Sequence, residues 1–139
     1  MISIGGENLI DLVSGAAAAD GLPQYVANPG GSPFNVAMAS GRQGQKVAYL
    51  TPVSEDALGA LLAERLVESK VTLAAGRVPH PTSLAVVSIT DGIPSYAFHR
   101  NGTAERQVTK QALHNDMPAE TKLFHVCLLY TSDAADDTR

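Results

Sequence analysis

A pair of adjacent glycines, Gly30-Gly31, precedes a segment with the features of a helix N-terminus. Glycine has no Cβ, so the backbone amides of this pair can approach a ligand closely. Ser32 and Pro33 suit the cap and the first position of a helix. Asn35, in the first turn, can both donate and accept hydrogen bonds. The segment therefore predicts a site for a polar or anionic ligand, although a purely structural turn remains an alternative for the glycine pair alone.

Three charged residues also stand where they could meet a ligand. Asp11 is an acid inside the apolar segment 9–13, and Arg100 ends a β-prone stretch. A solvent-facing strand position is the alternative for each. Asp56 precedes an apolar helical pattern, so helix capping is preferred over ligand contact there. No catalytic residue is predicted, because the chain has no nucleophile elbow. No metal site is predicted either, since the histidines lack metal-ligand spacing.

The elements that would position these residues alternate between strands and helices. Strands are expected at 1–5, 9–13, 24–27, 47–53 and 122–126, and a short strand with its connection at 71–77. Helices are expected at 32–43, 55–70 and 109–113. The helix at 32–43 would bury Phe34, Ala37, Met38 and Gly41 and end at Gly44. Asp91-Gly92 predicts a hairpin within 82–99, although Ile93-Pro94 leaves a longer loop open.

The spacing of several residues resembles a known family. The pattern consists of a glycine pair, a helix and a downstream Asp-x-x-Gly: Gly30-Gly31, Asn35, Ala37, Gly44, Asp56 and Gly59. It resembles the first signature of the ribokinase-like (PfkB) sugar kinases. Ser54 stands where most members have glycine, and serine is common there in the bacterial fructokinase-like branch. The resemblance extends from Ile2 to about Val126.

Two further segments are similar to motifs of the same family. GGENLIDLV resembles the GE-x-LID segment, whose aspartate, here Asp11, binds sugar hydroxyls. FHRNGTAER is similar to the aromatic-Tyr-Arg-x-x-Ser-Ala segment that lines the sugar pocket, with His99 in place of tyrosine and Thr103 in place of serine. The resemblance implies that Arg100 pairs with a sugar hydroxyl, or with the carboxylate of a sugar acid.

The resemblance also implies a fold. It is α/β, with a ribokinase-like three-layer αβα (Rossmann-like) core and a small β-sheet lid, truncated after about half the domain. Residues 1–126 would form the N-terminal half of the kinase domain, with lid strands at about 11–28 and 82–100. The remainder, 127–139, reads CLLYTSDAADDTR and is expected to be non-native or disordered, with a genuine acidic tail as the alternative.

The function implied by the resemblance is ATP-dependent phosphorylation of a sugar hydroxyl, with fructose as the preferred substrate. The expected sugar-binding residues are Asp11, Gly30, Gly31, Asn35 and Arg100. The full-length parent would use ATP and Mg²⁺, whereas this chain would bind neither and be inactive alone, because the family's general-base aspartate and nucleotide site lie in the second half. The alternatives are a 2-keto-3-deoxygluconate kinase fragment and a non-catalytic sugar-binding module that dimerises through its lid.

Composition fits a small globular domain. The chain has 139 residues, 45% of them hydrophobic and 17% charged, and a net charge of −4, which argues against nucleic acid or an anionic membrane as a partner. No apolar run approaches the roughly 20 residues that a membrane span needs, and no signal peptide is evident. The single cysteine, Cys127, excludes an internal disulfide. A cytoplasmic location is expected.

Overall fold

The computed structural model describes residues 1–127 of the chain, and a parallel sheet of four strands forms its centre. The strands are β1 (Ile2–Gly5), β4 (Val47–Tyr49), β6 (Val71–Leu73) and β10 (Leu123–Val126). Their order is β10-β1-β4-β6, so the chain moves from β1 through β4 to β6 and then returns to the other side of β1. The direction of winding therefore changes between β1 and β10. In open α/β sheets, ligands bind beyond the carboxyl ends of the strands at such a point.

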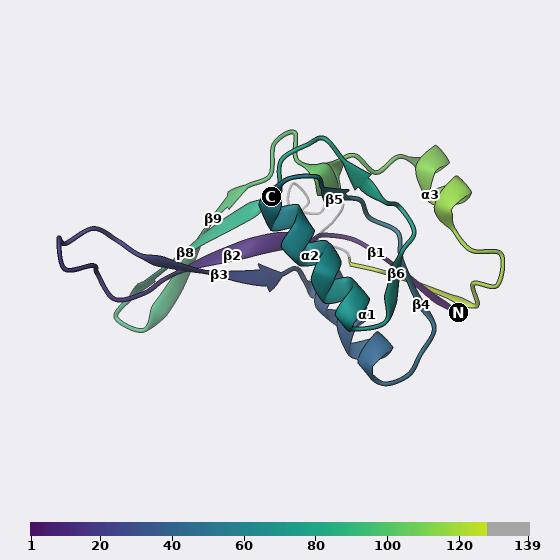
Figure 1. The fold of residues 1–139 in the computed structure, drawn as a ribbon, viewed down its shortest axis with the longest axis horizontal. Coiled ribbons are helices and arrows are strands. Elements are labelled where there is room, and N and C mark those ends of the chain that lie inside the picture. Colours follow the sequence, from purple (N-terminus) through teal and green to yellow (C-terminus); the bar gives the residue numbers. More distant parts are fainter. Residues whose placement is uncertain (128–139) are drawn as a thin grey trace, which may run out of the picture.

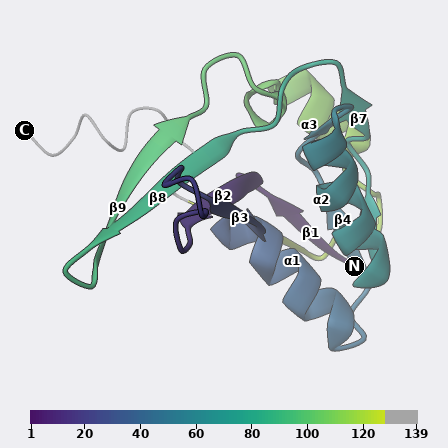
Figure 2. The same ribbon diagram turned by 60° about the vertical axis from the view of Figure 1, so that its left-hand side comes forward.

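Helices lie on both faces of this sheet. The helices α1 (Ser32–Arg42) and α2 (Ala57–Glu68) contact each other and pack on one face (Figure 1, Figure 2). The third helix, α3 (Lys110–Asp116), belongs to the connection from β6 back to β10. Crossover connections between parallel strands are right-handed. A connection that returns to the other side of β1 therefore runs over the opposite face of the sheet. Leu113 of α3 accordingly lines a cavity of about 80 Å³ with Gly5 and Phe124 of the sheet, which gives the expected αβα layering.

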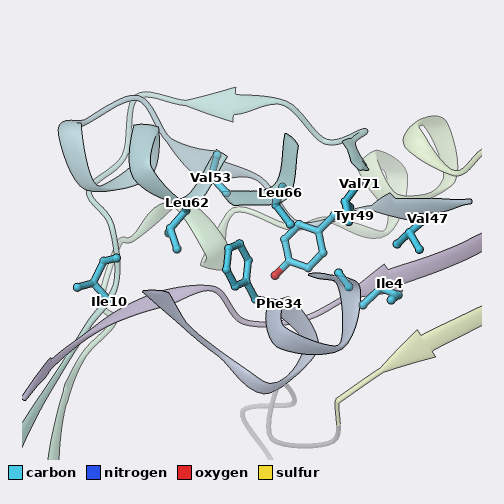
Figure 3. Close-up of a cluster of buried hydrophobic side chains, with 10 residues drawn as sticks. Ile4, Ile10, Phe34, Val47, Tyr49, Val53, Leu62, Leu66 and Val71 are labelled. Carbon is cyan, nitrogen blue, oxygen red and sulfur yellow. The ribbon is translucent and has the colours of Figure 1, made fainter. Parts of the chain in front are cut away.

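The hydrophobic core fills the space between the sheet and the helices α1 and α2 (Figure 3). Phe34 of α1 meets the ring of Tyr49 edge-on, with centroids 5.9 Å apart. Burying a side chain of this size contributes about 1.5–3 kcal/mol to folding. Gly41 allows α1 to approach the end of α2, because a Cβ there would collide with the carbonyl oxygen of Ser69. The buried cluster comprises Ile4, Ile10, Phe34, Ala37, Val47, Tyr49, Val53, Leu62, Leu66 and Val71.

A second sheet of four strands projects away from the helices (Figure 1). Its strands are β2 (Leu9–Ser14), β3 (Tyr25–Gly30), β8 (Leu84–Thr90) and β9 (Ile93–His99). Their order is β3-β2-β8-β9, with β2 parallel to β8 and the outer strands antiparallel to their neighbours. We refer to these four strands as the lid. They fall largely within the ranges 11–28 and 82–100 expected for it.

The pairing register places Asp11 in one row across the lid. Asn28 pairs with Asp11, Asp11 with Ala85, and Ala85 with Phe98. Paired residues on neighbouring strands point to the same face of a sheet. The four side chains therefore share one face, which we call the Asp11 face. The next row on this face contains Val26, Val13, Val87 and Tyr96.

The hairpin predicted at Asp91-Gly92 is confirmed. Asp91 and Gly92 have φ values of 53° and 77° and form a two-residue loop between β8 and β9. Positive φ at both positions is the signature of a type I′ turn, whose twist matches that of the flanking strands. The longer loop left open by Ile93-Pro94 is wrong, since both residues are already paired in β9.

Several local predictions are wrong by small amounts. Met38, expected to be buried, is half-buried, and the helix expected at 109–113 spans Lys110–Asp116. Gly31, with a φ of 105°, caps α1, and Ser32 is its first helical residue, so the expected cap lies one position too late. The strand expected at 47–53 is divided into β4, which ends at Tyr49, and β5 (Val53–Ser54). Pro52 lies between them and has no N–H to donate to a ladder. β5 pairs instead with β7 (Arg77–Val78) in a separate two-stranded sheet.

The end of the described chain follows the predicted order of elements. The side chain of Thr109 caps α3 by accepting a hydrogen bond from the backbone N–H of Ala112, at 3.0 Å. β10 then pairs in parallel with β1. Of the segment 127–139 expected to be non-native or disordered, all but Cys127 lies outside the described residues. Within residues 1–127, no helix combines the length and apolar character that crossing a bilayer requires.

Candidate functional site

Asp11 and Gly30 lie against each other on adjacent lid strands. A Cβ built on Gly30 would collide with Oδ2 of Asp11, so a residue with a side chain at this position would displace the carboxylate. Gly30 itself is buried, and Asp11 is half-buried. Burial raises the pKa of the Asp11 carboxyl above its ordinary value. The pair thus holds a partly desolvated carboxylate at the root of the lid.

Gly31 links this carboxylate to the N-terminus of α1. Its φ of 105° strains residues with a side chain, and a Cβ would lie 2.5 Å from the carbonyl oxygen of Glu7. Pro33 packs against Gly6, where a Cβ would collide with the proline ring. The helix N-terminus is therefore seated on the connection that follows the carboxyl end of β1. Backbone N–H groups of the first turn have no partner within a helix, and they suit a polar or anionic ligand.

Asn35 stands in the first turn of the same helix. Its backbone N–H donates to the carbonyl oxygen of Gly31 at 2.9 Å, and its side chain is exposed. The sequence prediction thus grouped four residues that the structure places around one junction: Asp11, Gly30, Gly31 and Asn35. The junction lies next to the change of winding at the carboxyl end of β1.

The connection between β1 and β2 is fixed by buried polar groups that the sequence analysis did not assign. The Tyr49 hydroxyl donates to the carbonyl oxygens of Gly6 and Glu7, at 2.7 and 3.0 Å. The N–H of Gly6 donates to the Thr51 hydroxyl at 2.8 Å, and the amide of Asn8 donates to the carbonyl oxygen of Pro52 at 3.2 Å. The partners in these hydrogen bonds are 42–45 positions apart in the sequence, which explains why no local pattern signals the contact.

Arg100 is held by two carboxylates of the chain itself. Its Nε and Nη2 atoms donate to the carboxylate of Glu105 at 2.7 and 3.1 Å. Its Nη1 atom lies 3.4 Å from Oε2 of Glu7. Neither partner was predicted, because Glu7 is remote from Arg100 in sequence, and the motif FHRNGTAER drew attention to Arg100 and not to Glu105. The expected contact between Arg100 and a sugar stays a prediction.

Arg100 also lines a cleft of about 360 Å³ at the junction of β8 and β9 with the core. Asp11, Gly30, Gly31 and Asn35 are not among the residues that line this cleft, but Phe98, which lines it, lies in the same row of the lid as Asp11. Glu7, the ion-pair partner of Arg100, also lies against Gly31 through its carbonyl group. The remaining lining residues are Pro81, Thr82, Leu84, Phe98, His99, Asn101 and Thr103.

Asp56 fulfils the predicted capping role and adds a second one. Its side chain accepts the N–H of Gly59 at 2.7 Å at the start of α2. It also accepts the backbone N–H of Thr82 at 2.8 Å and the Thr82 hydroxyl at 2.6 Å. Burial alone would raise the pKa of Asp56, but hydrogen bonds from Thr82, Gly59 and Ser54 outweigh it and lower the pKa to about 2. Asp56 thereby ties α2 to the segment that leads into β8.

Metal-binding clusters are not found in the part of the chain that the structure describes. No group of three or more His, Cys, Asp or Glu among residues 1–127 could hold a metal ion.

The chain is similar to sugar kinases in sequence. Fructokinase of Rhizobium leguminosarum bv. trifolii is 36% identical over 110 residues, which is 78% of this chain and 33% of that protein. Probable fructokinase-6, chloroplastic, of Arabidopsis thaliana is 36% identical over 126 residues, which is 86% of this chain and 33% of that protein. This chain therefore spans about a third of the length of the curated relatives it matches.

The fold is similar as well. A crystal structure of fructokinase from Xylella fastidiosa superposes with a TM-score of 0.83 at 26% identity, covering 97% of this chain and 45% of that one. Residues 6–138 match the description "pfkB family carbohydrate kinase". The chain has the ribokinase-like α/β fold of its structural neighbours, and it belongs to the pfkB family of carbohydrate kinases.

Proposed function

We propose that this chain forms the sugar-binding part of an ATP-dependent fructokinase. The observation that carries the proposal is the close contact of the Asp11 carboxylate with Gly30, beside the N-terminus of α1. A carboxylate accepts hydrogen bonds from two neighbouring hydroxyls, and helix N–H groups donate to sugar oxygens. The names of the relatives, several of which are fructokinases, support fructose as the sugar.

The proposed role of these residues in the reaction is to position the sugar. ATP would supply the γ-phosphoryl group, and a primary sugar hydroxyl would receive it. Asp11 accepts sugar hydroxyls, while Gly30 and Gly31 allow the sugar to lie close to the backbone. Asn35 adds an amide at the rim of the same junction. The lid excludes water, which would otherwise compete for the phosphoryl group.

We further propose that two copies of the chain associate through the Asp11 face of the lid. Tyr96 and Phe98 on this face are 57% and 59% exposed, and their rings are stacked with centroids 6.0 Å apart. Val26 and Ile89 on the same face are also more than half exposed. Exposed apolar patches on small soluble proteins commonly mark interaction sites, and a two-fold axis would pair this patch with itself.

Calorimetric titration of the 139-residue chain with D-fructose tests the sugar-binding proposal. Saturable binding that is lost in Asp11→Ala is the expected result, with Asp20→Ala, an acid in the loop of the lid, as the matched control. Absence of fructose binding by the folded wild-type chain would overturn the proposal.

A coupled assay with fructose, ATP and Mg²⁺ tests whether this chain provides only the sugar-binding part of the kinase. We expect no turnover, because the family's general base and nucleotide site follow the segment that this chain matches. Phosphorylation of fructose by the purified chain would contradict that expectation, and it would place a base within these 139 residues.

A further inference from the structure

Arg100 sits in a cluster with two acids drawn from different parts of the chain. Glu105 belongs to the short 3-10 turn η1 (Ala104–Arg106), and Glu7 belongs to the connection between β1 and β2. The side chains of Arg100 and Glu7 are 20% and 13% exposed, whereas that of Glu105 is fully buried. The three charged side chains are therefore largely shielded from solvent, unlike those of a surface ion pair.

The buried acid is embedded in a hydrogen-bond network at the root of the lid. Ser83 donates to Glu105 at 3.0 Å and shares a 2.7 Å hydrogen bond with the Thr103 hydroxyl. The Thr103 hydroxyl in turn donates to the carbonyl oxygen of Arg100 at 2.8 Å. Both carboxylate oxygens of Glu105 therefore have partners, Arg100 and Ser83 at Oε1 and Arg100 at Oε2.

By formal charge, the three side chains of this cluster are two acids and one base. Arg100 contributes one positive charge, and Glu7 and Glu105 contribute two negative ones. A bidentate contact occupies the Nε and Nη2 edge of the guanidinium with Glu105, and the Nη1 side faces Glu7. A substrate carboxylate at Arg100 would add a third negative charge to this cluster. A neutral hydroxyl would add none.

We propose that Glu7 and Glu105 determine specificity by positioning Arg100 and compensating its charge, so that the site selects a neutral ketose over a sugar acid. This inference rests on the proposed sugar-binding function and adds the substrate class to it. Glu7 and Glu105 act through Arg100 and are positioning residues. The proposal disfavours 2-keto-3-deoxygluconate, which is anionic, as the substrate.

Two sugars that differ at one carbon test the proposal. D-fructose and 2-keto-D-gluconate share the same configuration at C3 to C5, but C1 is a hydroxymethyl group in the first and a carboxylate in the second. Titration calorimetry on the 139-residue chain gives both affinities for the wild type, Glu7→Gln and Glu105→Gln. Glu68→Gln, which removes an exposed acid from α2, is the matched control for loss of one negative charge.

The wild type is expected to bind fructose more tightly than 2-keto-D-gluconate. Glu7→Gln should raise the ratio of the 2-keto-D-gluconate affinity to the fructose affinity by about tenfold, because charges near an interface act mainly on specificity. Glu105→Gln should act in the same direction. If burial makes that variant unstable, Glu7→Gln decides alone, since Glu7 makes a single 3.4 Å ion pair at the edge of the cluster.

The outcomes separate the two proposals. If the wild type binds fructose and the ratio of the two affinities stays unchanged in both variants, the specificity inference is wrong and the sugar-binding function stands. A parallel loss of both affinities indicates a merely structural role and also overturns the inference. If the folded wild type binds neither sugar, the sugar-binding function fails, and the inference fails with it.

Discussion

The carboxylate of Asp11 occupies the space that a side chain on Gly30 would need. The two residues lie on neighbouring antiparallel strands, β2 and β3, at the root of the lid. The absence of a side chain at Gly30 therefore keeps the Asp11 carboxylate in its place, in addition to any role of the glycine in the turn that follows. This relationship gives a direct test of the sugar site.

Substituting Gly30 by alanine is expected to displace Asp11 and weaken fructose binding. A displaced carboxylate loses its hydrogen bonds to the sugar, and we expect about a tenfold loss of affinity, or about 1.4 kcal/mol. Titration calorimetry measures the effect. Gly15→Ala is the control, because a Cβ at Gly15 would meet only an ordinary contact at 3.7 Å. Unchanged fructose affinity in Gly30→Ala would separate Asp11 from sugar binding.

Substituting Asp11 by asparagine should raise stability and reduce affinity together. Burial raises the pKa of Asp11, so its ionised form is less favourable in the folded chain than in the unfolded one. Above that pKa the carboxylate therefore subtracts from stability, and Asp11→Asn should unfold at a higher temperature at pH 7. Fructose affinity should fall, because the amide replaces one acceptor oxygen with a donor.

The same acid predicts a pH dependence of the wild type. Fructose affinity should decrease as the pH falls through the raised pKa of Asp11, which lies above the ordinary 3.8. Asp20→Asn, in the loop of the lid, is the control for both measurements. A variant Asp11→Asn that melts at a lower temperature would show that Asp11 stabilises the fold.

Removing the side chain of Asp56 should destabilise the fold in a pH-dependent way. Loss of the N-cap costs about 1 kcal/mol, and the contacts with Thr82 are lost as well. The folded pKa of about 2 lies below the ordinary 3.8, so the contribution of Asp56 is complete above pH 3.8 and disappears as the pH falls through 2. Urea unfolding of the wild type and Asp56→Ala should differ at pH 7 and converge near pH 2.

The neighbouring acid Glu55 is exposed and provides the control for this experiment. Glu55→Ala should leave the free energy of unfolding nearly unchanged at every pH. A difference between Asp56→Ala and the wild type that persists at pH 2 would mean that packing, and not the charged cap, accounts for the loss.

Replacing Tyr96 by serine tests association through the lid. Tyr96 stacks on Phe98 and lies on the exposed Asp11 face, so its loss should convert a dimer into a monomer. Light scattering after size-exclusion chromatography gives the mass. Val67→Ser is the control, because Val67 is 71% exposed on α2, away from the lid. A wild-type chain that elutes as a monomer at high concentration would refute the dimer.

Local patterns in the sequence were enough to predict the elements that local chemistry decides. Asp91-Gly92 provides the positive φ values of its turn, and Thr109 and Asp56 cap their helices as predicted. Asp11, Gly30 and Gly31 were grouped through a family resemblance, and the structure brings them together. Asn35 joins them because it lies in the first turn of α1, the helix that Gly31 caps.

The features that depend on tertiary contacts could not be read from the sequence. Arg100 was predicted without its two acids, because Glu7 meets it only after the lid has folded back on the core. The segment 47–53 is divided into two strands because β5 pairs with β7, which is remote from it in the sequence. The cap at Gly31 instead of Ser32 depends on the close approach of the Glu7 carbonyl.

The row Asn28, Asp11, Ala85 and Phe98 draws each of its members from a different strand. The ladder that holds these strands together is made by the backbone, so a side chain in the row can be exchanged without removing a hydrogen bond of the sheet. For protein engineering, the exposed members of the Asp11 face, such as Asn28, Tyr96 and Phe98, are therefore positions at which the proposed sugar binding and self-association can be altered while the backbone ladder of the lid stays the same.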